Sequence, residues 1–267
     1  MRTGTASQIL APAFAIAFLL AVAAPADSFP EHEWGAGSYL YYSTGDYGGS
    51  ENTDFLYWPG LLHRYTERWQ FTLTVPFVHM RSPEAHFIVD GEAVAVDTGE
   101  APERESNSGL GDVIFKATHH LVDQQDMWPW ISVFGRVKLP TADEEKGLGT
   151  GKTDVGLGVE TVRFFENGLL SFFDVGYTFI GEPSGADFSN RWSLSAGLGY
   201  RTTPDVMLAV FYEWRTAIAA NATDPRALSF LITRRVRHDL RTFVMTDLGL
   251  SDGAADFAAA AGFTHRF

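Results

Sequence analysis

The sequence contains no cysteine, and beyond its first 26 residues it has no apolar run long enough for a membrane-spanning helix. Without cysteine, no disulfide can cross-link the folded chain. Basic residues are also scarce, because 20 Lys and Arg stand against 33 Asp and Glu for a formal net charge of −13. This charge argues against nucleic acid as a partner, since phosphate groups need a basic surface. No long stretch shows the apolar period of an amphipathic helix.

The N-terminus has the three parts of a secretory signal peptide. Arg2 supplies a positive charge, Ile9–Ala24 is apolar, and Ala24-Pro25-Ala26 has the A-x-A form of a cleavage site. The apolar run is short for a membrane anchor that stays in place. We therefore expect a signal peptide at residues 1–26 and one exported domain at residues 27–267.

About twelve strand-like runs of roughly ten residues follow, with apolar and polar residues in alternation. This length suits tilted strands that cross a bilayer. The expected strands are Trp34–Thr44, Thr53–Tyr65, Arg68–Met80, Ser108–Leu121, Trp130–Leu139, Lys152–Phe164, Leu169–Ile180, Asn190–Thr202, Asp205–Ala217, Arg226–Val236, Leu240–Leu250 and Ala255–Phe267.

The connections between these strands alternate between short ones, such as Thr203-Pro204, and longer ones, such as Arg81–Asn107 and Pro140–Gly151. Transmembrane barrels have short periplasmic turns and longer extracellular loops, whereas a soluble β-sandwich has no reason to sort its loops. The sequence therefore predicts an all-β fold, a transmembrane antiparallel up-and-down β-barrel of about 12 strands in the bacterial outer membrane.

The last strand shows the same two faces. Phe257, Phe263 and Phe267 fall on one face, while Thr264 and Arg266 fall on the other. This strand resembles the closing strands of bacterial outer-membrane barrels, which typically end in Phe and carry alternating apolar residues before it. We expect the apolar face to contact outer-membrane lipid and the strand to pair with Trp34–Thr44. We also expect the strand ending at Phe267 to be the contact for the barrel-assembly machinery.

Aromatic residues gather near the two expected membrane interfaces, as barrel girdles do. The periplasmic group is Trp69, Trp128, Trp130, Phe164, Phe165, Tyr200 and Phe267. The outer group is Tyr57, Trp58, Phe77, Tyr177, Phe179, Trp192, Tyr212, Trp214 and Phe257.

Charged residues recur on the face opposite the apolar one, so we expect them to line the lumen. Arg201, Arg235 and Arg241 fall near the periplasmic mouth. The segments Asp27–Glu33 and Arg81–Asn107 are possible plugs of this narrow lumen. The full set is Asp112, Lys116, Arg136, Lys138, Asp154, Glu160, Asp174, Arg191, Arg201, Glu213, Arg215, Arg235, Arg241 and Asp247.

Three stretches carry a family resemblance: S-G-L-G-D-V-I-F-K-A at Ser108–Ala117, G-R-V-K-L-P-T-A-D at Gly135–Asp143, and G-L-G-T-G-K-T-D-V-G at Gly147–Gly156. They resemble the outer-membrane barrel family of the MetA pathway of phenol degradation, although Ala142 stands where that family usually has Gly. The resemblance implies a channel or uptake protein for small solutes, hydrophobic or aromatic ones included, without a cofactor. We expect Gly147–Gly151 to form an outer loop that contacts the lumen.

Other classes of site fit the sequence less well. Lys146 occupies the position where a phosphate-binding loop needs its first Gly. His119 and His120 point to opposite faces of a strand and cannot readily share a metal ion.

A lipid hydrolase needs a Ser/His pair near the outer rim. The serines considered, Ser171, Ser193, Ser195 and Ser229, have no histidine at matching height on a neighbouring strand of the expected register. We expect no catalytic, cofactor-binding or metal-ligating residue. A lipid-hydrolysing enzyme and a structural or adhesin-like barrel remain the alternatives to a channel.

Overall fold

The computed structural model describes residues 33–47, 52–82, 86–89, 92–95, 105–182, 187–219 and 222–267. The expected signal peptide and residues 27–32 of the expected plug lie outside them. Within these ranges, no helix is both long and apolar enough to cross a membrane. The strands are β1 (Trp34–Gly45), β2 (Thr53–Tyr65), β3 (Trp69–Ser82), β4 (His86–Val89), β5 (Glu92–Ala95), β6 (Glu105–Leu110), β7 (Val113–Val122), β8 (Trp130–Leu139), β9 (Asp154–Phe164), β10 (Leu169–Phe179), β11 (Arg191–Thr203), β12 (Val206–Arg215), β13 (Arg226–Arg235), β14 (Leu240–Gly249) and β15 (Phe257–Arg266).

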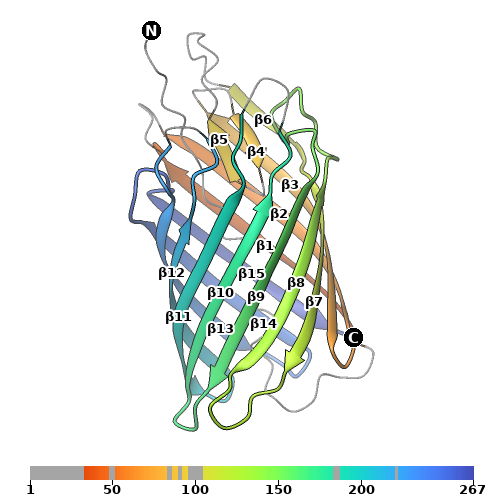
Figure 1. Cartoon of the computed structure of the whole chain (residues 1–267), viewed down its shortest axis with the longest axis vertical. Helices are drawn as coiled ribbons and strands as arrows, with labels where there is room; N and C mark the ends of the chain where they lie inside the picture. Colours follow the sequence, from red (N-terminus) through yellow and green to blue (C-terminus); the bar gives the residue numbers. More distant parts are fainter. Residues whose placement is uncertain are drawn as a thin grey trace.

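The strands form a closed, tilted antiparallel barrel (Figure 1). Closure is made by β1 and β15, whose register runs from Gly35 opposite Arg266 to Thr44 opposite Phe257. Because β6 and β7 both pair with β3, they act as one interrupted strand, and the barrel has twelve strands. Among the described barrel strands, closure gives every strand except β6 a partner on both sides, as a strand in hydrocarbon requires, and β6 pairs only with β3 at the long-loop end. The expected fold is confirmed.

The interruption of the fourth strand corrects one expectation. The sequence suggested a strand that begins at Ser108, but β6 begins at Glu105, and the break falls later, at Gly111 and Asp112. Opposite the break lies Pro76, which has no N–H to continue the ladder and whose carbonyl accepts a hydrogen bond from Gly111 N at 2.9 Å. Two successive buried residues at the break act as a β-bulge and turn Asp112 into the barrel.

The segment Arg81–Asn107 was expected to be one long connection, and the structure corrects this as well. It contains the β4–β5 hairpin and the start of β6. The hairpin lies at the end of the barrel that carries the long connections, at the top of Figure 1. There the amide of Ile88 donates a hydrogen bond to the Gly147 carbonyl at 3.1 Å.

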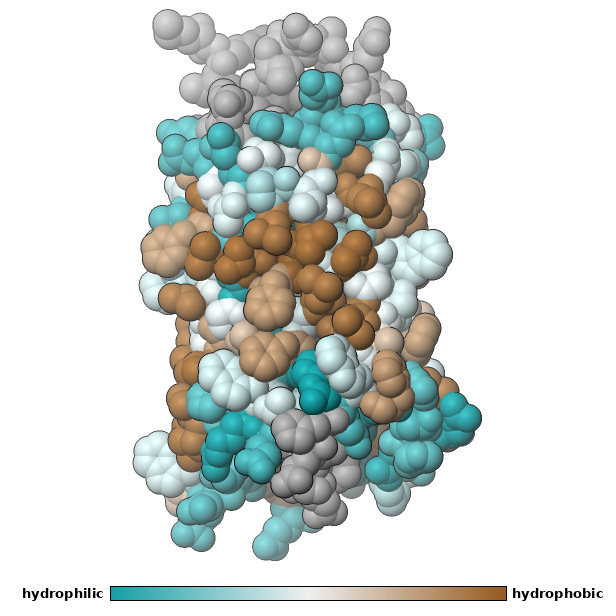
Figure 2. All heavy atoms as spheres, turned by 90° about the vertical axis from the view of Figure 1, so that its right-hand side faces the viewer, coloured by the Kyte–Doolittle hydropathy of each residue, from teal (hydrophilic) through white to brown (hydrophobic). Residues whose placement is uncertain are grey.

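The outer surface is apolar in its middle and polar at both ends. Figure 2 shows a brown band across the barrel between two teal rims. Leu198, Ile232 and Val244 are among the exposed apolar side chains of the outer face. This is the surface that a bilayer-spanning barrel presents to lipid.

Three residues of the expected aromatic girdles do not face outward. Tyr57 is buried inside the barrel, and Trp130 and Phe164 pack against the buried apolar cluster. Proximity to a strand end determines how far along the barrel axis an aromatic residue lies. Whether its side chain points inward or outward depends on the alternation of side chains along the strand.

Candidate functional site

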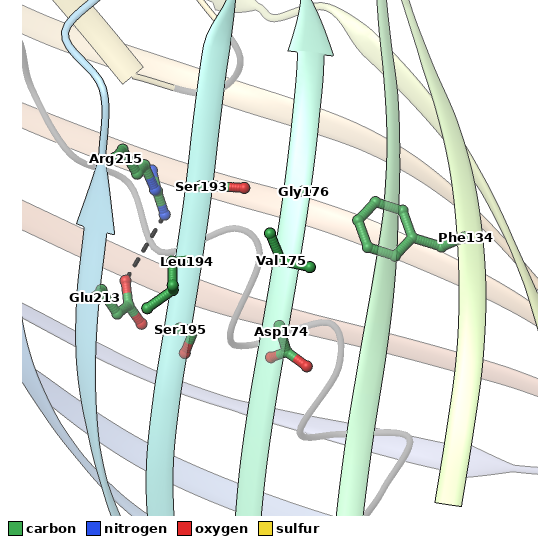
Figure 3. A pocket seen from close by; sticks show the side chains of 9 residues that line it. All are labelled: Phe134, Asp174, Val175, Gly176, Ser193, Leu194, Ser195, Glu213 and Arg215. Carbon is green, nitrogen blue, oxygen red and sulfur yellow. Dashed lines mark ion pairs between the residues drawn. The ribbon is translucent and has the colours of Figure 1, made fainter.

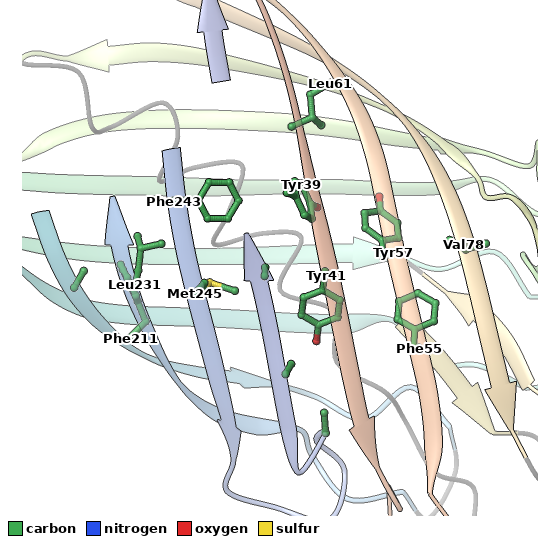
Figure 4. Close-up of a cluster of buried hydrophobic side chains, with 14 of the residues drawn as sticks. Tyr39, Tyr41, Phe55, Tyr57, Leu61, Val78, Phe211, Leu231, Phe243 and Met245 are labelled. Carbon is green, nitrogen blue, oxygen red and sulfur yellow. The ribbon is translucent and has the colours of Figure 1, made fainter. Parts of the chain in front are cut away.

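One part of the barrel's inner face is an apolar and aromatic wall, drawn in Figure 4. The ring of Tyr39 lies between those of Tyr57 and Phe243, with centroid distances of 5.9 and 6.0 Å. Strands β1, β2, β3, β12, β13, β14 and β15 contribute the wall, whose members include Tyr39, Tyr41, Phe55, Tyr57, Leu61, Val78, Met80, Phe211, Leu231, Phe243 and Met245. This wall was not predicted from the sequence, although the odd-numbered aromatic residues of β1 and β2 indicated it.

Glycines on the inner face provide room for these rings. A Cβ atom at Gly197 would lie 2.2 Å from the ring of Phe211, and one at Gly262 would lie 2.4 Å from Tyr39 Cβ. Such distances are far inside van der Waals contact, so any larger residue would displace the rings. Gly197 on β11 and Gly262 on β15 therefore shape the interior.

The fourteen charged residues expected to line the lumen all lie on inner-face positions of the strands or at the adjoining break. Nine are buried and five are half-buried. The buried residues are Asp112, Arg136, Lys138, Asp154, Glu160, Arg191, Glu213, Arg215 and Asp247, and the half-buried residues are Lys116, Asp174, Arg201, Arg235 and Arg241.

A three-residue ion cluster stands near the long-loop end. The Lys138 ammonium lies 3.0 Å from Asp112 Oδ2 and 3.0 Å from Asp154 Oδ2. It also donates a hydrogen bond to Thr150 Oγ1 at 3.1 Å. Such a buried cluster keeps its geometry because losing one partner leaves the others charged and unpaired.

This cluster anchors the loop between β8 and β9. The amides of Thr141 and Ala142 both donate to Asp112 Oδ1 at 3.0 Å. Farther along the loop, Leu148 and Thr150 are buried. The loop that carries the G-L-G-T-G stretch is therefore folded into the mouth of the barrel.

Glycine is required at several points of this loop. Gly147 and Gly151 adopt positive φ angles of 67° and 63°, and a Cβ atom at Gly149 would lie 2.8 Å from the Asp112 carboxylate. In the exposed part of the loop, Lys146 Nζ lies 2.9 Å from Asp143 Oδ2. The hydrogen bond that Lys146 donates lowers the pKa of the Asp143 carboxyl. The loop thus has a buried, anchored part and an exposed part.

A second ion pair lies deeper in the barrel. Lys116 Nζ contacts Glu160 Oε1 at 2.5 Å and lies 4.4 Å from the ring centroid of Phe134. Close by, Arg136 Nη2 donates to Thr178 Oγ1 at 2.9 Å. These contacts hold the long cationic side chains of β7 and β8 against residues of β8, β9 and β10.

A small cavity opens beside these residues, and Figure 3 shows Asp174, Ser195, Glu213 and Arg215 around it. Glu213 and Arg215 form an ion pair of 3.7 Å, and Ser229 Oγ lies 3.4 Å from Glu213. Asp174 Oδ1 and Ser195 Oγ are buried without a hydrogen-bond partner among the described residues. The cavity can orient a polar group or water, but the described residues contain no cluster that could hold a metal ion.

Two Ser–His pairs were not predicted from the sequence. His120 Nδ1 lies 3.2 Å from Ser132 Oγ, and His120 Nε2 lies 2.9 Å from Asp123 Oδ1. On the outer face, His79 Nδ1 lies 2.6 Å from Ser108 Oγ, because β3 and β6 place the two residues directly opposite each other. The serines considered from the sequence were Ser171, Ser193, Ser195 and Ser229, so neither pair was among them. No acid among the described residues is hydrogen-bonded to His79, so a complete triad is not assembled there.

A known outer-membrane channel shares this architecture. A crystal structure of the COG4313 outer membrane channel from Pseudomonas putida F1 superposes with a TM-score of 0.67 at 14% identity, covering 91% of this chain and 99% of that chain. The P. putida toluene transporter TodX gives a TM-score of 0.44 at 11% identity, with 91% of each chain covered. No curated protein matches the sequence. The family described as "Putative MetA-pathway of phenol degradation" matches residues 53–267, and the chain belongs to this family.

Proposed function

We propose that this outer-membrane barrel is an uptake channel for small solutes, hydrophobic and aromatic ones included. The observation that carries the proposal is the aromatic wall inside the barrel, built on Tyr39, Tyr57 and Phe243. An apolar solute gains about 25 cal/mol for each Å² of apolar surface that leaves water, and aromatic pairs add about 0.5–1.5 kcal/mol. A wall of this kind offers such a solute a path that a purely charged lumen would not.

The charged residues have a different part in this proposal. We assign the fourteen inner-face residues to lining the passage, where their ion pairs hold polar groups away from the aromatic wall. The anchored loop between β8 and β9 narrows the outer mouth, and Leu148 presents an apolar side chain there. In this arrangement the aromatic wall determines which solutes pass, and the loop between β8 and β9 determines whether a solute can enter the barrel.

The test must avoid pure phospholipid vesicles, because small aromatic compounds cross them unaided. Initial uptake of radiolabelled toluene should instead be measured in intact bacteria that lack or express the chain. Expression should raise the rate several-fold, and Phe243→Ser should lower it. Ile232→Ser, a matched change on the outer face, should leave the rate unchanged.

Rates equal to those of non-expressing cells, with the barrel folded in the membrane, would refute the channel. Planar-bilayer conductance and liposome swelling with sugars complete the test, since they report the passage of hydrophilic solutes.

Lipid hydrolysis is a second candidate, favoured by the Ser108–His79 contact and by His120, whose Nδ1 lies 3.2 Å from Ser132 Oγ while its Nε2 lies 2.9 Å from Asp123 Oδ1. A hydrolase requires that purified protein release fatty acids from phospholipid and that Ser108→Ala or Ser132→Ala abolish this release. A channel requires neither result. A structural or adhesin-like barrel would show neither uptake nor hydrolysis.

We also propose that the barrel-assembly machinery recognises β15 together with Phe267, whose side chain is exposed. Deletion of Phe267 should reduce the amount of folded barrel in cells while leaving refolding of purified chain into detergent intact. Equal loss in both settings would indicate a folding defect and contradict recognition.

A further inference from the structure

Four arginines form a cluster on the inner face at the end with the short connections. The arginine cluster consists of Arg201 on β11, Arg235 on β13, Arg241 on β14 and Arg266 on β15, all half-buried. Arg241 lies within electrostatic influence of the other three. Short connections mark the periplasmic side of such barrels, so the cluster lies at the exit of the passage.

Few carboxylates balance these charges. Arg235 pairs with Asp205 at 2.8 Å, whereas no ion pair joins Arg201, Arg241 or Arg266 to an acid among the described residues. Glu33 also lies at this end, close enough to Tyr65 for an electrostatic interaction between the two side chains. Arg235 also stands directly opposite Arg241 in the β13–β14 ladder, and like charges in that position repel. The cluster therefore has an excess of positive charge that an anion would relieve.

A buried histidine adds a neutral donor to the same place. His63 lies on β2 close enough to Arg266 to feel its charge, and its ring stacks on Tyr65 at 5.8 Å. Its Nδ1 lies 3.0 Å from Thr72 Oγ1, which also lies 3.5 Å from Gln70 Nε2. When the Thr72 hydroxyl donates to Nδ1, the ring proton sits on Nε2, which is then a donor. That Nε2 is buried without a hydrogen-bond partner among the described residues.

Apolar side chains begin directly beyond the charges. Phe243 lies two residues from Arg241 on the same face, a separation of about 7 Å along a strand. The Arg266 guanidinium lies over the Tyr65 ring at 4.8 Å. The site therefore combines cationic donors, an unpartnered ring nitrogen of His63 and aromatic surface.

We propose that the arginine cluster and His63 bind the carboxylate of amphiphilic organic acids, aromatic carboxylates above all, with the apolar body against Phe243. This inference rests on the proposed channel function and narrows its solute class. A guanidinium presents two parallel N–H donors that match a carboxylate, and charge-assisted bonds of this kind are stronger than neutral ones. An uncharged analogue would leave these donors unused.

The test compares binding of benzoate, benzyl alcohol and inorganic phosphate to the purified full chain in detergent by titration calorimetry. Wild type should bind benzoate at least about tenfold more tightly than either other ligand. Arg241→Gln combined with Arg266→Gln should remove this preference. Arg237→Gln is the matched control, since Arg237 lies in the β13–β14 turn with its side chain exposed, and it should retain the preference. Detergent gels of unboiled samples show that each variant is folded.

Equal affinity for benzoate and benzyl alcohol in wild type would overturn the inference, as would a preference that survives the double substitution. Phosphate binding as tight as benzoate binding would also overturn it, because the aromatic surface would then contribute nothing. Toluene uptake separates these outcomes from the proposed function. Uptake that persists without benzoate preference leaves the channel in place, whereas absent toluene uptake refutes the channel itself.

Discussion

The Lys138 ammonium lies 3.0 Å from Asp112 Oδ2, and this contact joins β8 to the break between β6 and β7. Asp112 thus anchors the loop between β8 and β9 to the barrel, because the same carboxylate accepts hydrogen bonds from two loop amides. Removing the carboxylate should loosen the loop more than the barrel.

Replacing Asp112 by Ala should destabilise the anchored loop by on the order of 3 kcal/mol, since a buried cation loses a partner and two amides lose their acceptor. Trypsin should then cut after Lys146 or Lys152 at least about tenfold faster in the folded barrel. Asp143→Ala removes only the exposed pair with Lys146 and should change the rate little. Equal rates for wild type and Asp112→Ala would show that the loop is held by other contacts.

Replacing Gly197 by Ala should destabilise the barrel by roughly 1–3 kcal/mol, because the added Cβ atom overlaps the Phe211 ring. Gly60 is the matched control, since a Cβ atom there meets only the Val75 carbonyl at 3.8 Å. Urea unfolding of detergent-solubilised protein, followed by tryptophan fluorescence, measures both effects. Similar midpoints for the two variants would contradict the packing described for the interior.

Arginine in place of Ile232, which is exposed on the outer face of β13, should cost about 2–4 kcal/mol in a lipid bilayer. The same change at Val236, just past the end of β13, should cost about 0–1 kcal/mol because that position lies near the interface. Refolding into vesicles followed by urea titration provides the comparison. A cost at Val236 equal to that at Ile232 would place the lipid boundary elsewhere.

The turn between β13 and β14 carries a pH-dependent contact with the last strand. His265 Nε2 donates to Asp239 Oδ2 at 2.8 Å, and this hydrogen bond lowers the pKa of Asp239 from its ordinary value of 3.8. Because the pKa of Asp239 is lower in the folded state than in the unfolded state, its ionised carboxyl stabilises the barrel at pH values above the unfolded-state pKa. This stabilisation is lost as the pH falls through the folded-state pKa. The stability difference between wild type and Asp239→Asn should therefore be present at pH 7 and shrink below about pH 4. His265→Gln should show the same loss at neutral pH, and a difference that grew in acid would contradict this account.

Much of the fold follows from the sequence because side chains alternate with period two. Ile232 and Thr233 fall on opposite faces in any barrel, and the expected strands Thr53–Tyr65 and Trp130–Leu139 match β2 and β8. The break at Gly111 depends on Pro76 in another strand, so local pattern could not place it. The same limit hid the contact of Ser108 with His79, since it exists only in the observed register.

The site was predictable in part. Alternation placed Asp112, Lys138 and Asp154 on one face, but their common contact at Lys138 depends on how neighbouring strands are staggered. The burial of Leu148 depends on a loop that folds back into the mouth, for which the sequence offered only glycines. The same alternation places the aromatic residues of the wall on the inner face, but only the charged residues of that face were predicted to line the lumen.

The pairing of β1 with β15 makes the first and last strands of the barrel neighbours. The chain cannot complete its hydrogen bonding while it is being synthesised, because the partner of Gly35 is Arg266. Until the carboxyl terminus is present, one side of β1 has no partner and the sheet has two open edges. Closure of the barrel therefore waits for β15, and a chain truncated before β15 should be cleared as an unfolded polypeptide rather than persist as a smaller barrel.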